Sequence, residues 1–257
     1  MSVLYRALSF FLLAAFTAAV FAQAQKAPST YKPSVGQEGK DVVWVPTPQA
    51  LVDKMLDMAK VTPRDYLIDL GSGDGRTVIT AAKRGINALG IEYNPDMVAL
   101  SKENAAKEGV SGRAQFKKAD LFQTDLSKAD VITMFLLPDI NLKLRPKILD
   151  LKPGTRIVSN TFTMGEWEPD ETGSPEACDG SWCTALLWIV PAKVAGTHKI
   201  AQGELTLKQE FQKVSGTLRT EGRTVPVEGK VTGDEIAFQA GGREYRGKVN
   251  GKRLELR

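Results

Sequence analysis

Apolar residues recur with two different spacings along the chain, and the change from one spacing to the other divides it. Between Thr47 and Pro191, short apolar runs typical of buried strands alternate with amphipathic segments of helical spacing. From residue 203 to residue 257 the helical spacing is lost, and short alternating runs are separated by glycine. The pattern predicts an α/β unit followed by a small β-rich unit.

The first unit has the order expected of a parallel sheet covered by helices on both faces. Thr47 is expected to cap a helix that has Pro48 in its first turn and ends near Lys60, and Asn94 is expected to cap another. Strands are expected at residues 66–70, 88–92, 114–120, 129–137 and 155–162, and further helices at 76–84, 94–108 and 138–151. Strands that alternate with helices at this spacing form right-handed βαβ units.

The second unit reads as a β-meander, forming a small barrel or sandwich. Residues 227–239 and 245–257 share the pattern G-K-V-x-G, and the dipeptides Thr232-Gly233 and Asn250-Gly251 are typical of hairpin turns. We place the α/β unit at residues 46–192 and the β-rich unit at 198–257. His198 is assigned no role.

The first residues are expected to be a targeting segment and not part of either unit. Arg6 is followed by an uncharged apolar run from Leu8 to Ala22 and by the sequence Ala-Gln-Ala. This is the layout of a signal peptide, cleaved before Gln25, so we expect an exported, periplasmic protein. A retained membrane anchor is the alternative, although the run is shorter than the roughly 20 residues of a spanning helix. Residues 25–45 lack periodicity and read as a linker or arm.

Charge and cysteine content narrow the picture further. The formal net charge of +4 is too small to indicate a nucleic-acid partner. Cys178 and Cys183 are the two cysteines, and in an exported chain an even cysteine count favours a disulfide, here closing a short loop with Asp179-Gly180 as its turn. A free or redox-active pair is the alternative. Zinc would need more ligands than two thiols and the one histidine can provide.

A glycine-rich turn follows the first predicted strand. Residues 67–76 read LIDLGSGDGR, with glycine at positions 71, 73 and 75. In an open parallel sheet, ligands bind beyond the carboxyl ends of the strands, and glycine lets the backbone approach them closely. A dinucleotide fingerprint would need its third glycine at position 76, which is Arg76. The pattern therefore disfavours a nicotinamide oxidoreductase and favours a different nucleotide-like cofactor.

Two more strand ends carry carboxylates that belong with this turn. Glu92 ends the second predicted strand, and a carboxylate there can accept hydrogen bonds from both hydroxyls of a ribose. Asp120 and Leu121 follow the third strand. Each acid alone reads as surface charge near a loop, but the carboxyl ends of parallel strands meet at one edge, so together they predict one pocket.

The motif G-x-G-x-G after Asp69 resembles motif I of class I S-adenosylmethionine-dependent methyltransferases. V-P-T-P, GIE-x-N-P, ADLF and LKPGTRIVSNTFTMGEWEPD resemble the small mitochondrial protein-lysine methyltransferases and their bacterial relatives, over about residues 43–170. A fainter similarity reaches the Dot1-like enzymes. The resemblance implies a Rossmann-like fold and S-adenosyl-L-methionine as cofactor. It places Glu92 at the ribose, Asp120 at the adenine amino group and Leu121 at the ring, and assigns cofactor binding also to Asp69, Gly71, Ser72, Gly73, Asp74 and Gly75.

By the same resemblance the reaction is an in-line displacement of the cofactor's methyl group by a protein lysine, with membrane proteins among the candidate substrates. We expect an aromatic wall and a polar group near the acceptor amine, and name Asp139 and Trp167, with Phe162, as candidates. The absence of an N-P-P-[YF] motif argues against methylation of adenine or glutamine amides. An exported binding or scaffold protein that lost turnover and a small-molecule methyltransferase are the alternatives.

Overall fold

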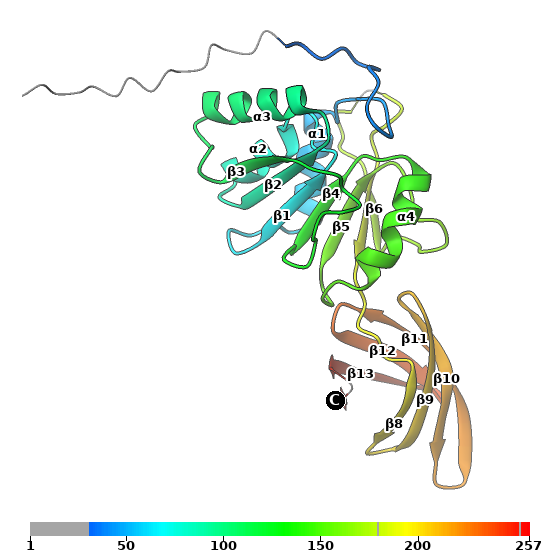
Figure 1. Ribbon diagram of the computed structural model, residues 1–257. Helices are drawn as coiled ribbons and strands as arrows, with labels where there is room; N and C mark the ends of the chain where they lie inside the picture. Colours follow the sequence, from blue (N-terminus) through cyan, green and yellow to red (C-terminus); the bar gives the residue numbers. More distant parts are fainter. Residues whose placement is uncertain (1–30, 179, 252) are drawn as a thin grey trace, which may run out of the picture.

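The computed structural model describes residues 31–178, 180–251 and 253–257. The expected signal peptide and the first residues of the expected linker lie outside this part of the chain. Within it, no helix has the length and apolar character needed to cross a bilayer. Figure 1 shows a helix-covered sheet joined to a curved, all-β sheet.

The first sheet has seven strands in the order β3-β2-β1-β4-β5-β7-β6. The strands β1 to β5 pair in parallel, and β7 and β6 extend the sheet in antiparallel fashion. Their bounds are β1 Tyr66–Leu70, β2 Asn87–Glu92, β3 Ala114–Lys118, β4 Val131–Met134, β5 Arg156–Asn160, β6 Glu171–Gly173 and β7 Ala185–Ile189. The sequence pattern predicted the five parallel strands and missed β6 and β7.

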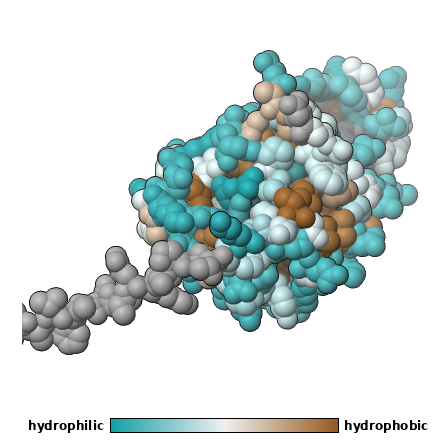
Figure 2. Space-filling model, turned by 90° about the horizontal axis from the view of Figure 1, so that it is seen from above, coloured by the Kyte–Doolittle hydropathy of each residue, from teal (hydrophilic) through white to brown (hydrophobic). Residues whose placement is uncertain are grey.

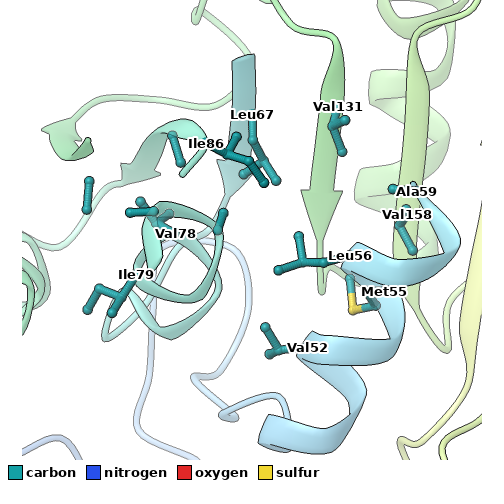
Figure 3. Packing of buried hydrophobic residues seen from close by; sticks show 14 of the residues in the cluster. Val52, Met55, Leu56, Ala59, Leu67, Val78, Ile79, Ile86, Val131 and Val158 are labelled. Atoms are coloured by element: carbon teal, nitrogen blue, oxygen red, sulfur yellow. The ribbon is translucent and has the colours of Figure 1, made fainter. Parts of the chain in front are cut away.

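Four helices cover both faces of this sheet. They are α1 Gln49–Met58, α2 Arg76–Lys83, α3 Pro95–Lys107 and α4 Pro138–Leu149. Apolar residues of α1, α2 and α3 form one core with the sheet, and those of α4 form a second core with the other face. Figure 3 shows Val52, Met55 and Leu56 of α1 and Val78 of α2 turned toward the strands. The residues of each helix that pack on the sheet recur at helical spacing. For this reason the apolar pattern of the sequence predicted the helices.

Two capping predictions had different outcomes. The side chain of Asn94 accepts hydrogen bonds from the backbone N–H groups of Asp96 and Met97, which confirms it as a cap of α3. The prediction for Thr47 was wrong, because α1 begins one residue later with Pro48 as its N-cap and no side-chain capping bond. Thr47 is buried instead and accepts a 3.4 Å hydrogen bond from Asn160.

The C-terminal sheet is an antiparallel meander of seven strands in sequential order. Its strands are β8 Gly196–Ile200, β9 Gly203–Glu210, β10 Lys213–Thr220, β11 Arg223–Thr232, β12 Glu235–Ala240, β13 Arg243–Asn250 and β14 Arg253–Leu256. The first and last strands approach each other, so that the sheet is a nearly closed barrel around its own apolar core. The sequence pattern missed β8, which contains His198.

Aromatic stacking fixes the barrel to the first sheet. Trp167 stacks on Phe211 with the ring centroids 6.1 Å apart, and its carbonyl accepts a 2.7 Å hydrogen bond from the indole of Trp188. Gln212 donates to the carbonyl of Glu168 at 2.8 Å. The linkage therefore involves packed side chains as well as the connecting chain, and Figure 1 shows the barrel at the end of the molecule away from the N-terminal arm.

Cys178 and Cys183 form a disulfide bond, as the cysteine spacing predicted. The bridge lies between β6 and β7, and Cys178 packs against the first core. Of the expected turn pair, Asp179 lies outside the described residues.

Candidate functional site

The glycine-rich turn connects the carboxyl end of β1 to the start of α2. Gly71, Gly73 and Gly75 have φ angles of +74°, +55° and +85°, a region that side chains rarely adopt. The amides of Gly71 and Ser72 both donate to the carbonyl of Ile91 on β2. The turn is thereby held against the neighbouring strand end, as the sequence motif requires.

Asp69 lies at the base of a cavity that this turn borders. Its carboxyl group is buried and accepts a 2.6 Å hydrogen bond from the hydroxyl of Thr133 on β4. Burial, assisted by the nearby charges of Glu92 and Asp74, raises the pKa of Asp69 to about 7. Near neutral pH this carboxyl group therefore changes charge inside the cavity.

Glu92 connects β2 to the glycine-rich turn. One carboxylate oxygen accepts from the amide of Gly73 at 3.0 Å, and the other accepts from the amide of Asn94 at 2.9 Å. Because both oxygens are engaged, the carboxylate is held in one orientation beside the turn. It also lines the cavity, where a ribose could compete for the same oxygens.

Asp120 lines the same cavity from the end of β3, together with Leu121. The Lys40 ammonium group donates to the Asp120 carboxylate at 2.7 Å and lies 4.9 Å from the centre of the Tyr93 ring. The hydrogen bond from Lys40 is the largest cause of the lowered pKa of Asp120, with the amide of Phe122 next. Asp120 is therefore charged and faces the arm that carries Lys40.

Residues 36–46, which we call the N-terminal strap, contribute to this cavity, a role that the sequence pattern did not predict. The amide of Gly36 donates to the carbonyl of Trp44, and the amide of Trp44 donates to the carbonyl of Gln37, so the strap closes on itself. Residues 37–46 line the cavity. The half-buried indole of Trp44 packs against Gly73. A Cβ at that position would lie only 2.6 Å from the indole nitrogen. The segment expected to be a linker or arm, residues 25–45, therefore forms part of the cavity wall from residue 37 onward.

Arg76 occupies the position where a dinucleotide site would have glycine. Its guanidinium group pairs with Asp74 through two nitrogens, at 3.0 and 2.6 Å, and donates to the carbonyl of Thr47 at 2.9 Å. The arginine thus ties the glycine-rich turn to the segment that precedes α1.

Most of the residues selected from the sequence meet in this one cavity. Its lining includes Asp69, Gly71, Ser72, Gly73, Asp74, Glu92, Asp120 and Leu121. Gly75 is not among the lining residues: a Cβ there would lie 2.7 Å from the Phe116 ring, so the glycine serves the packing of α2. Their individual contacts with a cofactor stay predictions.

Of the three acceptor-site candidates, Phe162 lines the cavity, whereas Asp139 and Trp167 lie elsewhere. Trp167 is completely buried between the first sheet and the barrel, so it cannot form the wall of an open site, and that prediction was wrong. Asp139 is exposed in the first turn of α4 and does not line the cavity; a carboxylate there suits the helix dipole. The aromatic residues at the cavity are Phe135, Phe162 and Trp182 in addition to Trp44 and Tyr93.

The charged groups that line the cavity suit a cationic cofactor. Carboxylates predominate among its charged groups, which are Glu38, Asp41, Asp69, Asp74, Glu92 and Asp120 with the bases Lys40 and Arg76. The hydroxyl oxygen of Ser72 is buried next to Gly90 and has no hydrogen-bond partner within the described chain. No cluster of three metal-ligating side chains occurs among the described residues. These features fit S-adenosylmethionine, whose sulfonium supplies an electrophilic methyl group.

The strand order, with the antiparallel β7 next to β5, and the glycine-bordered cavity at the strand ends define a class I S-adenosylmethionine-dependent methyltransferase. Residues 69–171 match the family model described as the ANTKMT methyltransferase domain. A protein-lysine N-methyltransferase of Saccharolobus islandicus is 43% identical over 162 residues, which cover 62% of this chain and 96% of the relative. The chain therefore belongs to this methyltransferase family, and its cofactor is S-adenosylmethionine.

Two further proteins are similar to this chain. The mouse adenine nucleotide translocase lysine N-methyltransferase is 33% identical over 120 residues, 46% of this chain, and the match covers 52% of its length. A solved structure of an RNA methyltransferase from Salinibacter ruber in complex with S-adenosyl-L-homocysteine is 45% identical, with a TM-score of 0.54, and the match covers 58% of this chain and 96% of that one. The barrel lies outside the residues that match the family model.

Proposed function

We propose that this protein N-methylates a lysine side chain of a protein substrate by in-line transfer of the cofactor's methyl group. The observation that carries the proposal is the acidic cavity with an aromatic opening. An acidic cavity attracts an alkylammonium group, whereas a polyanionic RNA would be repelled. The relatives from Saccharolobus islandicus and mouse, which are lysine N-methyltransferases, support the same substrate class.

The residues of the site would act by positioning and by excluding water. A lysine must lose its proton before its nitrogen can attack the methyl group, and desolvation between aromatic rings lowers the pKa of an amine. Alignment of the two reactants then provides most of the rate increase, because methyl transfer needs no covalent help from the protein. Export to the periplasm, which the N-terminal sequence predicts, would restrict the substrates to envelope proteins.

Transfer of a labelled methyl group tests this proposal. Purified protein is incubated with labelled S-adenosylmethionine and either membrane and periplasmic extract or total RNA. We expect label in protein, recovered as methylated lysine after acid hydrolysis, and expect that Glu92→Ala greatly reduces it. The exposed Leu142 on α4 does not line the cavity, so Leu142→Ala serves as the matched control. Label that is sensitive to ribonuclease and absent from lysine would contradict the proposal and favour RNA as the substrate.

A further inference from the structure

Trp182 lies at the opening of the cofactor cavity, one residue from the bridged Cys183. Its side chain lines the cavity and is 42% exposed. The ring centroids of Trp182 and Phe135 lie 6.1 Å apart, with the planes tilted by 58°. The Cys178–Cys183 disulfide bond therefore fixes the chain beside an aromatic residue that faces the site.

Two more aromatic residues belong to this group, and each of them follows a strand of the first sheet. Phe135 follows β4, Phe162 follows β5, and their rings stack with centroids 5.8 Å apart. We call Phe135, Phe162 and Trp182 the aromatic mouth. Figure 2 shows the molecule from above, where several hydrophobic groups are exposed on a mainly hydrophilic surface.

The turn that presents Phe162 is held in a strained conformation. Thr161 has a φ angle of +59°, which a β-branched residue rarely adopts. The carbonyl of Phe162 accepts hydrogen bonds from Ser159 at 2.8 Å and from Asn141 at 3.2 Å. Strain of this kind persists where the surrounding structure enforces it, most often at functional sites.

The ligand chemistry of the mouth follows from its rings and the charges behind it. Aromatic faces attract ammonium groups, and the carboxylates of the cavity, among them Glu38 and Asp41, attract the same charge. We propose that the aromatic mouth is the binding site of the acceptor amine, and that the Cys178–Cys183 bridge positions Trp182 for it. Amine binding is then weaker when the disulfide is reduced. This inference rests on the proposed function.

Binding of n-butylamine tests the mouth without turnover. Saturation-transfer NMR follows the amine in the presence of S-adenosylhomocysteine, and calorimetry measures the affinity for S-adenosylhomocysteine separately. We expect saturable amine binding to the oxidised wild type. Trp182→Ala, or reduction of the disulfide, should weaken amine binding by about fivefold, since a cation–π contact is lost, and should change the affinity for S-adenosylhomocysteine by less than about twofold. Trp182→Phe should retain most of the amine affinity, and Leu142→Ala should leave it unchanged.

Other outcomes decide against parts of the proposal. No amine binding to the wild type, or equal binding to the wild type and Trp182→Ala, would overturn the aromatic mouth as the amine site. If Trp182→Ala loses affinity but the reduced protein and the Cys178→Ser, Cys183→Ser variant bind as well as the wild type, the positioning role of the bridge is wrong; a thermal melt shows whether each is folded. Displacement of the bound amine by adenosine, with S-adenosylhomocysteine present, would indicate that the aromatic mouth binds a nucleobase. This result would overturn the mouth as an amine site. Amine binding through Trp182 without lysine methylation in extracts would contradict the proposed function alone.

Discussion

Replacement of Asp69 by asparagine should make the folded protein more stable at alkaline pH. Asparagine has the same shape, and its carbonyl oxygen can still accept the hydrogen bond from Thr133. Burial raises the pKa of Asp69 from 3.8 to about 7. The folded chain thus binds the proton more tightly than the unfolded chain between these two values, so its stability falls as the pH rises through this interval.

The size of the effect follows from the shift. Three pKa units correspond to about 4 kcal/mol, of which about 2 to 3 kcal/mol develops between pH 5 and pH 8. Urea unfolding of the cofactor-free wild type and of Asp69→Asn, followed by tryptophan fluorescence at both pH values, gives the difference in unfolding free energy. Relative to the wild type, the unfolding free energy of Asp69→Asn should therefore increase by about 2 to 3 kcal/mol between pH 5 and pH 8.

The same change at the exposed Asp139 controls for the general effect of removing a carboxylate. A wild-type and variant difference that is equal at both pH values, within about 0.5 kcal/mol, would refute the reasoning. It would mean that the pKa of Asp69 in the folded protein lies close to its value in the unfolded chain, so that its ionisation costs little in this cavity.

Three further predictions concern the cofactor and the barrel. In calorimetry, the affinity for S-adenosylmethionine should rise by about tenfold from pH 5.5 to pH 7.5, because ionised Asp69 attracts the cation. The pH dependence should vanish in Asp69→Asn. A pH dependence that persists in this variant would have to come from another group. Gly73→Ala places a Cβ 2.6 Å from the indole nitrogen of Trp44, at a residue whose φ is +55°. The substitution should displace the strap and weaken cofactor binding by at least about tenfold. An unchanged cofactor Kd would contradict the role of the strap. Trp167→Ala should lower the unfolding free energy by about 3 to 5 kcal/mol, measured in urea, while leaving the cofactor Kd unchanged; lost cofactor affinity in the folded variant would place Trp167 at the site after all.

The sequence predicted those parts of the site that follow from local patterns and from sheet geometry. The glycine-rich turn has a local signature, and Glu92 and Asp120 could be placed because the carboxyl ends of parallel strands meet at one edge. The same reasoning predicted the five parallel strands. It did not predict β7, because a short apolar run such as ALLWI cannot be told from a buried helical segment by spacing alone.

The missed residues depend on contacts between distant parts of the chain. The strap has no periodicity, and its conformation depends on Trp44 packing beside Gly73, a contact that no local rule contains. Trp167 follows β5 closely and looked like a site residue, yet it turns into the barrel interface. Trp182 reaches the cavity because β7 runs antiparallel to β5, so the segment before β7 lies at the carboxyl end of β5. A choice between the two tryptophans therefore needs the strand order.

The position of Asp69 also explains why a destabilising carboxyl group is useful at this point of the fold. Above its pKa of about 7 the buried charge costs stability, and the nearby charges of Glu92 and Asp74 increase that cost. A cationic cofactor reverses the balance, because a positive charge in the cavity compensates a carboxylate that is almost completely buried. Binding energy is then gained from the same charge that weakens the empty protein. The asparagine variant should for this reason be more stable and bind the cofactor less well, so stability and binding should change in opposite directions.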